Sequence, residues 1–425
     1  MITIEIQPTF TEVIQDVKFN KSSTFTDQFW INFYDSLNSV EDGFATEEII
    51  KVANSSTSEN DLIFENDKAQ FKETRIHDRD AFQLEYSGET YLIKPPRGQI
   101  QIPSNISITQ LTVNPQKTQL SLGTDSGDII LIDLTTNESR VISMAHLNSI
   151  TTLCYFPSGS VLLSVGLDYQ IKLWDTSVSL NQDQAEDGKD LDLNPARIFT
   201  GHKKQITSVA MIDRGRNFLS GGKDGIVKLW DCASGECLFD FQRANSVRDV
   251  VTDTQVYEKS TQLQFVKVHE GEFGTENKTA LIGYDSGVVV LWDLHSKKEI
   301  GVIPSTLSAS VAKIVAIKQG GKGEEYIIAY SDGTISRWDL NHDKEKPVTQ
   351  TRLNGKINAM QLVTGPLERI VVSYGSGFVV ELNIKTLTLM SILAGKGMDC
   401  DVKFVTCSDD GEIMVGNSNG SIYRF

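Results

Sequence analysis

The amino-acid sequence predicts an all-β chain in which four-stranded antiparallel sheets are repeated as the blades of a propeller. Residues 201–241 show the unit most clearly. Its first strand is an apolar alternation at 206–212, its third strand ends at Trp230, and its fourth strand lies at 237–241. Runs of about five residues separated by turn residues are typical of antiparallel strands. One such sheet cannot bury both of its faces alone, so further copies are expected.

A turn residue followed five positions later by a large apolar residue recurs seven times along the chain. The pairs are Gly127 and Ile132, Tyr169 and Trp174, Gly225 and Trp230, Gly287 and Trp292, Gly333 and Trp338, Gly377 and Leu382, and Gly420 and Phe425. The apolar members are 42, 56, 62, 46, 44 and 43 residues apart. A blade repeat has a period of about 40 to 45 residues, so four intervals fit and two carry insertions. The sequence therefore predicts a seven-bladed propeller.

The seventh unit ends at Phe425, so its fourth strand has to come from upstream. Residues 99–102, which precede the first strand of the first unit at 108–113, are the candidate. Pairing there would leave no unpaired edge between the last blade and the first. We therefore expect a propeller over residues 98–425, closed by a strand near 99–102.

Residues 1–97 do not follow the repeat and are predicted to form a separate small, mostly β domain of acidic composition. Short strands are expected at 2–6, 29–33, 62–64 and 91–93, and a helical turn at 46–52. Pro95 and Pro96 mark its boundary. The two long intervals are expected to be solvated loops, at 176–195 between the third and fourth strands of one blade and at 253–277 between the first and second strands of another.

The net charge of −16 argues against a general nucleic-acid binder, because an acidic chain repels phosphate backbones. The charge either attracts a basic protein partner or serves solubility, and both interpretations stay open. No apolar run reaches 18 residues, and the first ten residues have neither a basic start nor an apolar core. We therefore expect neither a signal peptide nor a membrane span.

The sequence offers no basis for an enzyme, a cofactor or a metal site. The five cysteines form no C-x-x-C pair, which favours reduced thiols. His269 beside Glu270 and Glu272 is read as a polar loop. The string GNSNG at 416–420 matches a nucleophile elbow centred on Ser418, but an elbow needs a helix after the turn and a later histidine, and no histidine follows His342.

The tripeptides LWD at 173–175, 229–231 and 291–293 and RWD at 337–339 resemble the WD-repeat family. Four residue types recur at intervals of 18, 4 and 6 in the second and third units: His146, Ser164, Asp168 and Trp174, and His202, Ser220, Asp224 and Trp230. In the WD family these positions form a buried hydrogen-bonded relay from Trp through Ser and His to Asp. We interpret them as structural rather than catalytic, because the set recurs and each member satisfies a buried polar group.

Three consecutive blades carry a tyrosine three residues before the turn glycine, which is two residues before the residue that precedes that glycine. These are Tyr284 in GYDSG, Tyr330 in AYSDG and Tyr374 in SYGSG, with Asp285 and Asp332 nearby. Equivalent residues of repeats lie side by side, so the rings would form an arc. Exposed aromatic residues among acids suit a protein interface. The alternative is that the three rings pack between the blades.

The segment IDRGRNFLSGGKDGIVKLWDCASGECL at 212–238 resembles the corresponding blade of the proteasomal ATPase-associated factor family, and AHLNSITTLCYFPSG at 145–159 and FWINFYD at 29–35 are similar in kind. Those proteins are WD-repeat chaperones in the assembly of the proteasome regulatory particle. The resemblance implies a monomeric, non-catalytic protein of cytoplasm and nucleus that holds the basic C-terminal domain of a proteasomal ATPase subunit. It places acidic contact residues in the link at 395–401, here Asp399 and Asp401, although this link also holds Lys396. A substrate receptor of a ubiquitin ligase is the alternative.

Overall fold

The computed structural model describes residues 2–22, 24–35, 46–55, 61–76, 79–100, 102, 106–177, 194–243, 249–258, 271–305, 307–317, 325–343, 345–363, 368–395, 398, 400–407 and 411–425. Contacts group the chain into two compact units. The terminal unit comprises Met1–Ser104, Gly333–Ile335 and Thr349–Phe425, and the central unit comprises Asn105–Asp332 and Ser336–Val348.

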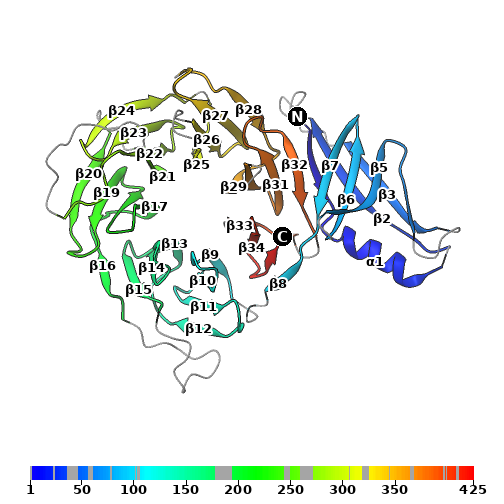
Figure 1. Ribbon diagram of the computed structural model, residues 1–425, viewed down its shortest axis with the longest axis horizontal. Helices are drawn as coiled ribbons and strands as arrows, with labels where there is room; N and C mark the ends of the chain where they lie inside the picture. The colour runs from blue at the N-terminus through cyan, green and yellow to red at the C-terminus, as the bar shows by residue number, and fades with distance from the viewer. Residues whose placement is uncertain are drawn as a thin grey trace. The chain divides into compact units, whose positions relative to one another are not determined.

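Four-stranded antiparallel sheets make up the central unit, which confirms the predicted β-propeller fold class (Figure 1). The first four sheets are β9 (Ile108–Val113), β10 (Gln119–Thr124), β11 (Ile129–Asp133) and β12 (Ser139–Ile142); β13 (Ile150–Tyr155), β14 (Val161–Gly166), β15 (Ile171–Asp175) and β16 (Arg197–Phe199); β17 (Ile206–Ile212), β18 (Asn217–Gly222), β19 (Ile226–Asp231) and β20 (Cys237–Gln242); and β21 (Val251–Glu258), β22 (Lys278–Tyr284), β23 (Val289–Asp293) and β24 (Lys298–Ile303). The division between the units falls in the fifth sheet, β25 (Val311–Ile317), β26 (Glu325–Tyr330), β27 (Thr334–Asp339) and β28 (Thr349–Arg352).

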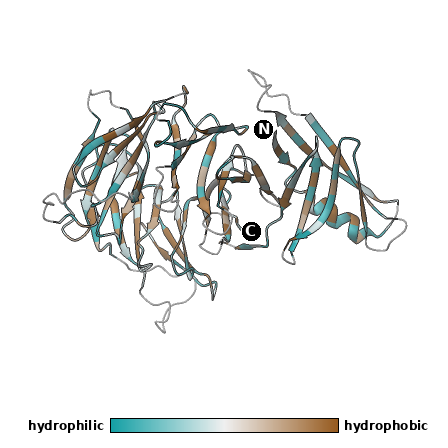
Figure 2. Cartoon of the chain, turned by 45° about the horizontal axis from the view of Figure 1, so that its top comes forward, coloured by the Kyte–Doolittle hydropathy of each residue, from teal (hydrophilic) through white to brown (hydrophobic). Residues whose placement is uncertain are grey.

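The second strand of these sheets is buried over most of its length, whereas the first strand mixes buried with partly exposed residues. Every residue of β10 and of β18 is buried, while β17 alternates between buried and half-buried residues. Alternation indicates one fully covered face, and continuous burial indicates two. Leu163 and Leu173 of the second sheet share a hydrophobic cluster with Trp230 of the third, so adjacent sheets pack face to face. Hydrophobic residues accordingly recur along the strands in Figure 2.

The terminal unit holds the last two sheets. The sixth contains β29 (Ile357–Val363), β30 (Arg369–Tyr374), β31 (Phe378–Asn383) and β32 (Leu389–Leu393), and the seventh contains β33 (Val402–Cys407), β34 (Ile413–Asn417), β35 (Ile422–Arg424) and β8 (Gly98–Ile100). The upstream strand thus completes the seventh sheet, with Ile100 opposite Ile422. It begins one residue before the expected segment 99–102 and ends at Ile100.

Three strands from the first hundred residues extend the sixth sheet. β7 (Glu89–Lys94) pairs in parallel with β32, and β6 (Arg79–Tyr86) and β5 (Ala69–Ile76) follow it, giving a seven-stranded sheet. Ser391 lies opposite Leu92 in this parallel pair. Residues 1–97 are therefore joined to the repeats by backbone hydrogen bonds between β7 and β32. The sequence analysis predicted a separate domain and did not predict this pairing.

The remaining N-terminal elements differ from the sequence prediction at two places. One four-stranded sheet consists of β1 (Ile2–Ile6), β2 (Thr26–Asp35), β3 (Thr46–Asn54) and β4 (Leu62–Glu65). The predicted helical turn at 46–52 is wrong, because this segment belongs to the strand β3. Alternating burial at Glu48, Ile50 and Val52 is the period of a strand. The helix is α1 (Phe10–Asn20), whose buried residues Phe10, Val13, Ile14 and Val17 follow the helical period.

Of the two expected loops, only part is described. Residues 178–193 of the first and 259–270 of the second lie outside the described residues. β21 continues to Glu258, so residues 253–258 belong to a strand and not to the loop predicted to begin at 253. The strand pairs with β22 as far as its last residue, where Glu258 lies opposite Lys278.

Candidate functional site

The turns between second and third strands share one backbone feature. The turn residue has a positive φ angle in all seven units: Gly127, Tyr169, Gly225, Gly287, Gly333, Gly377 and Gly420. Glycine adopts this left-handed region without a Cβ clash, which explains why it recurs there. Tyr169, with φ of 64°, is the exception. A bulky residue in this conformation costs about 1–2 kcal/mol, and such strain often marks a functional position.

The relay residues of the second sheet form a continuous hydrogen-bonded chain. Trp174 Nε1 lies 2.8 Å from Ser164 Oγ, which lies 2.7 Å from His146 Nε2, and His146 Nδ1 lies 3.0 Å from each carboxylate oxygen of Asp168. An indole N–H can only donate, so Ser164 accepts from it and donates to Nε2. The imidazole proton is thereby assigned to Nδ1 and donated to Asp168.

The third sheet repeats this geometry. Trp230 Nε1 lies 2.8 Å from Ser220 Oγ, which lies 2.7 Å from His202 Nε2, and His202 Nδ1 lies 2.9 Å from the nearer carboxylate oxygen of Asp224. Burial favours the protonated carboxyl, but hydrogen bonds from the histidine and from backbone N–H groups outweigh it and lower the pKa of Asp168 and of Asp224. Each relay ties a turn to the preceding link and leaves no exposed nucleophile, because both serines are fully buried.

Two glycines that the sequence analysis did not single out make room for the relays. A Cβ on Gly166 would come within 2.5 Å of His146 Nδ1, and one on Gly222 within 2.6 Å of an Asp224 carboxylate oxygen. Each glycine stands two residues before the relay aspartate. That shared interval is the signal from which the sequence could have identified them.

The turns and the links between sheets lie together on one surface of the central unit, which we call the turn face. It comprises the turns at 125–128, 167–170, 223–225, 285–288 and 331–332 and the links at 143–149, 200–205 and 249–250. Hydrogen bonds connect them: His146 N–H donates to Gly127 O, and Lys223 N–H donates to Gln205 O. Ser286 Oγ contacts the Asp249 carboxylate.

Four large apolar side chains are exposed on the turn face at the second sheet. Met144 is 75% exposed, Leu147 73%, Tyr169 44% and Leu167 39%. They flank the relay residues His146 and Asp168, whose hydrogen bonds fix the backbone that carries them, since Leu147 N–H also donates to Asp168. We call these four residues the apolar patch. Clustered exposed apolar residues rimmed by polar ones are typical of a protein-binding surface.

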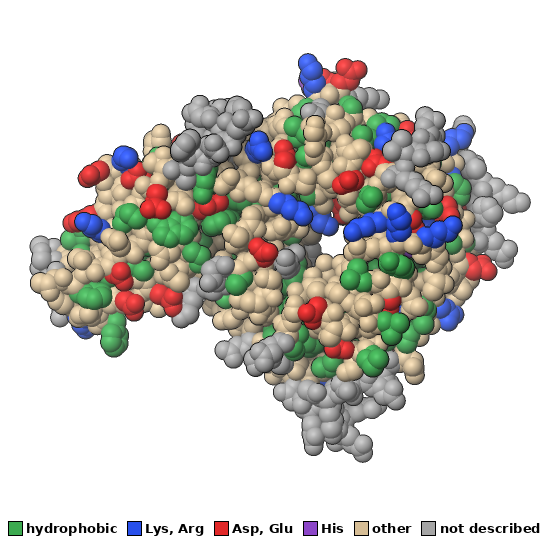
Figure 3. All heavy atoms as spheres, turned by 180° about the vertical axis from the view of Figure 1, so that it is seen from behind, with side chains coloured by type: hydrophobic (Ala, Val, Ile, Leu, Met, Phe, Trp, Pro, Cys, Tyr) green, Lys and Arg blue, Asp and Glu red, His purple; other side chains and the backbone are tan. Residues whose placement is uncertain are grey.

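Charge on the turn face has both signs. The third sheet presents the exposed residues Lys203, Lys204 and Lys223, while the fourth presents Asp285, which is exposed. Figure 3 likewise shows Lys and Arg side chains interspersed with Asp and Glu and with exposed hydrophobic side chains on the side of the molecule in view. The turn face of the central unit therefore carries charges of both signs, although the chain as a whole is acidic.

The three tyrosines predicted to form an exposed arc are buried, so that interpretation is wrong for them. Tyr284 is 1% exposed, and Tyr330 and Tyr374 are 0% exposed. Each is the last residue of a second strand, and each lies opposite the first residue of the preceding strand. All three side chains are shielded from solvent, and burial raises the pKa of all three hydroxyls. Tyr284 and Tyr330 belong to hydrophobic clusters, as the alternative interpretation of packing between the blades predicted.

The predicted acidic contact residues have different surroundings. Asp285 is exposed, and its backbone N–H donates to Val250 O. Asp332 is half-buried at the next turn. Asp401 is exposed, and its carbonyl accepts from Ser418 N–H, while Asp399 lies outside the described residues.

Comparison with known proteins identifies the repeats. Residues 138–175 and 193–231 match the family model described as "WD domain, G-beta repeat". The chain carries WD repeats. It is similar to the 26S proteasome regulatory subunit RPN14 of Saccharomyces cerevisiae, 33% identical over 207 residues, which are 47% of this chain and 45% of that protein.

Other similar proteins belong to different systems. The CCR4-associated factor 4 homolog of Candida glabrata is 25% identical over 215 residues, 50% of this chain and 35% of that protein. The DDB1- and CUL4-associated factor 11 homolog of Caenorhabditis elegans is 30% identical over 115 residues, 27% of this chain and 19% of that protein. The matches span less than half the length of each of these three relatives.

No group of three or more His, Cys, Asp or Glu side chains in the described residues is arranged to hold a metal ion. None of the helices in the described part has the length and apolar character needed to span a membrane.

Proposed function

We propose that the protein is a non-catalytic chaperone for assembly of the proteasome regulatory particle, which binds the C-terminal domain of an ATPase subunit of the base. The similarity to a proteasome regulatory subunit over 207 residues carries this proposal. The resemblance at 212–238 supports it, and so does a turn face whose side chains are positioned by buried relays. The proposed location is cytoplasm and nucleus.

The turn face supplies two kinds of contact in this proposal. The apolar patch anchors the partner, because a few well-placed aromatic and aliphatic side chains carry most of the binding energy of an interface. Asp285 and Asp332 attract basic side chains of the ATPase domain, and such rim charges affect the association rate more than the affinity. Asp401 and Asp399 remain proposed contacts in the link before the seventh sheet.

The test is a binding measurement between the full chain and the isolated C-terminal domain of each base ATPase subunit by surface plasmon resonance. We expect one domain to bind, Leu147→Asp to abolish binding, and Asp332→Lys to slow association and weaken its salt dependence. The matched control is Ile198→Asp, because Ile198 is 48% exposed on β16, the outermost strand of the same sheet. Binding to none of the domains would refute the proposal.

The alternative is a substrate receptor of a ubiquitin ligase, which the 30% identity to a DDB1- and CUL4-associated factor homolog favours. Affinity purification of the full chain followed by mass spectrometry distinguishes the two. Recovery of base ATPase subunits supports the chaperone, whereas recovery of a ligase adaptor without them supports the receptor.

A further inference from the structure

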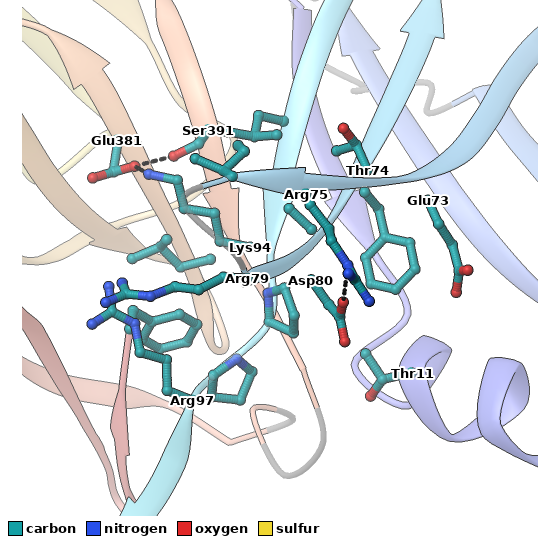
Figure 4. A pocket seen from close by; sticks show the side chains of 18 of the residues that line it. Thr11, Glu73, Thr74, Arg75, Arg79, Asp80, Lys94, Arg97, Glu381 and Ser391 are labelled. Atoms are coloured by element: carbon teal, nitrogen blue, oxygen red, sulfur yellow. Dashed lines mark hydrogen bonds and ion pairs between the residues drawn. The ribbon is translucent and has the colours of Figure 1, made fainter.

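The terminal unit contains a cavity of about 1360 Å³ whose role the proposed function does not cover. It is lined by α1, by the strands β5 and β6, by β7 with the link to β8, and by strands of the sixth sheet (Figure 4). Apolar side chains contribute to its wall, among them Phe82, Leu92, Pro96, Met390 and Leu393. Sites for small ligands usually measure about 300–1000 Å³, so this cavity is large enough for a peptide segment.

The cavity wall is positively charged although the protein is acidic. Six Lys and Arg residues line it against four Asp and Glu residues, whereas the whole chain has 40 basic and 56 acidic residues. The buried carboxylate of Glu381 contacts both Lys94 and Arg369, so one positive charge remains there. An excess of positive charge in a concave site concentrates the field and attracts anions.

Two of the lining cations are available to a ligand. Lys18 is paired with Glu73 at 2.6 Å, and Arg75 with Asp80 at 3.4 Å. Arg79 and Arg97 are exposed, and within the described residues neither has an ion-pair partner. Figure 4 shows both side chains extending toward the same side of the cavity, away from the ion pair of Arg75 and Asp80.

We propose that this cavity binds an extended acidic peptide segment of a partner protein. Successive side chains of an extended peptide point to opposite sides. Carboxylates at alternate positions reach Arg79 and Arg97, and the apolar side chains between them pack on the half-buried Leu92 and Met390. Guanidinium groups bind carboxylates through paired, charge-assisted hydrogen bonds, which makes arginine well suited to this role.

The test is fluorescence anisotropy of the full chain with a fluorescein-labelled peptide of alternating Glu and Leu. Matched peptides carry Lys or Ser in place of Glu. We expect the Glu peptide alone to bind, and Arg79→Glu and Arg97→Glu each to weaken it about tenfold, or ~1.4 kcal/mol. Arg79→Lys keeps the charge and is expected to lose less than Arg79→Glu.

The matched control is Arg214→Glu, because Arg214 is likewise exposed but lies in the central unit. Equal weakening by that variant would show nonspecific attraction and refute the site, as would equal binding of the Ser peptide. Inorganic phosphate is expected to compete no better than chloride at equal ionic strength, and selective displacement by phosphate would instead assign a phosphate site. No proteasome subunit is present in this measurement, so its failure is separate from a failure of the proposed chaperone function.

Discussion

The second and third sheets have the same interior and different surfaces. Their relays agree within about 0.1 Å in the Trp–Ser, Ser–His and nearer His–Asp distances. At equivalent positions around these relays, however, the second sheet exposes Met144, Leu147, Leu167 and Tyr169, while the third has Thr200, Lys203, Lys223 and Gly225. The comparison indicates that the relay fixes the backbone of a turn and leaves its outward positions free to specify a partner.

The largest expected effect is on stability, when the interior shared by the two sheets is broken. Ser220→Ala leaves Trp230 Nε1 and His202 Nε2 buried without their hydrogen-bond partner. Each unsatisfied group costs about 1–3 kcal/mol, so we expect a clear fall in the thermal midpoint by differential scanning calorimetry. Ser164→Ala should cause a similar fall, because the second relay has the same contacts.

A double-mutant cycle sharpens this prediction. Ser220 and Asp224 belong to one relay, whereas Ser220 and Asp168 belong to different sheets. We expect a coupling energy of about 0.5–3 kcal/mol for the first pair and near zero for the second. Equal coupling in both pairs would show that the relays are not independent units.

The second prediction exchanges the surfaces. The variant Met144→Thr, Leu147→Lys, Leu167→Lys and Tyr169→Gly gives the second sheet the outward residues of the third. We expect the thermal midpoint to stay within a few degrees, because these side chains are exposed, and binding of the ATPase domain to weaken more than about tenfold, since the anchoring residues are gone. Unchanged binding would remove the apolar patch from the interface. The variant Lys203→Ala with Lys223→Ala in the third sheet is the matched control.

How much of this could be predicted from the sequence depends on whether a feature repeats. The relays and the turn residues were predictable because their intervals recur between units and because buried polar groups need partners. The apolar patch was missed because it lies where the second unit departs from the third. Tyr284 and Tyr330 are buried because neighbouring sheets pack on them. The local sequence pattern of a tyrosine beside an acidic residue gives no information about that packing.

The N-terminal region lacks such repetition, and the predictions there were correspondingly weaker. The local composition of the segment 46–52, TEEIIKV, is compatible with a helical turn. It forms a strand instead because it pairs with β2, a contact outside the segment itself. α1 could have been found from the spacing of Phe10, Val13, Ile14 and Val17. The parallel pairing of β7 with β32 joins residues about 300 apart in sequence, and no local pattern specifies such a contact.

The third prediction concerns acid. The folded pKa values of Asp168 and Asp224 lie below the ordinary 3.8, so each carboxylate stabilises the fold above that pH, and the contribution is lost as pH falls through the folded value. The difference in thermal midpoint between the wild type and Asp224→Asn should therefore be largest near neutral pH and shrink on acidification. A difference independent of pH would mean that the charge of Asp224 does not matter. Asp285→Asn, at an exposed site, is the control.

The smallest expected effect separates strain from packing at Tyr169. Tyr169→Gly relieves the left-handed conformation, worth about 1–2 kcal/mol, but adds the backbone entropy of glycine, about 0.5–1 kcal/mol. We expect the free energy of unfolding to rise slightly, by about 0.5 kcal/mol, in denaturant titrations. The reciprocal Gly225→Tyr in the third sheet should lower it by a comparable amount. A loss on Tyr169→Gly would mean that the ring packs on the fold, whereas a gain together with weaker partner binding would show that the second sheet keeps a strained tyrosine for recognition.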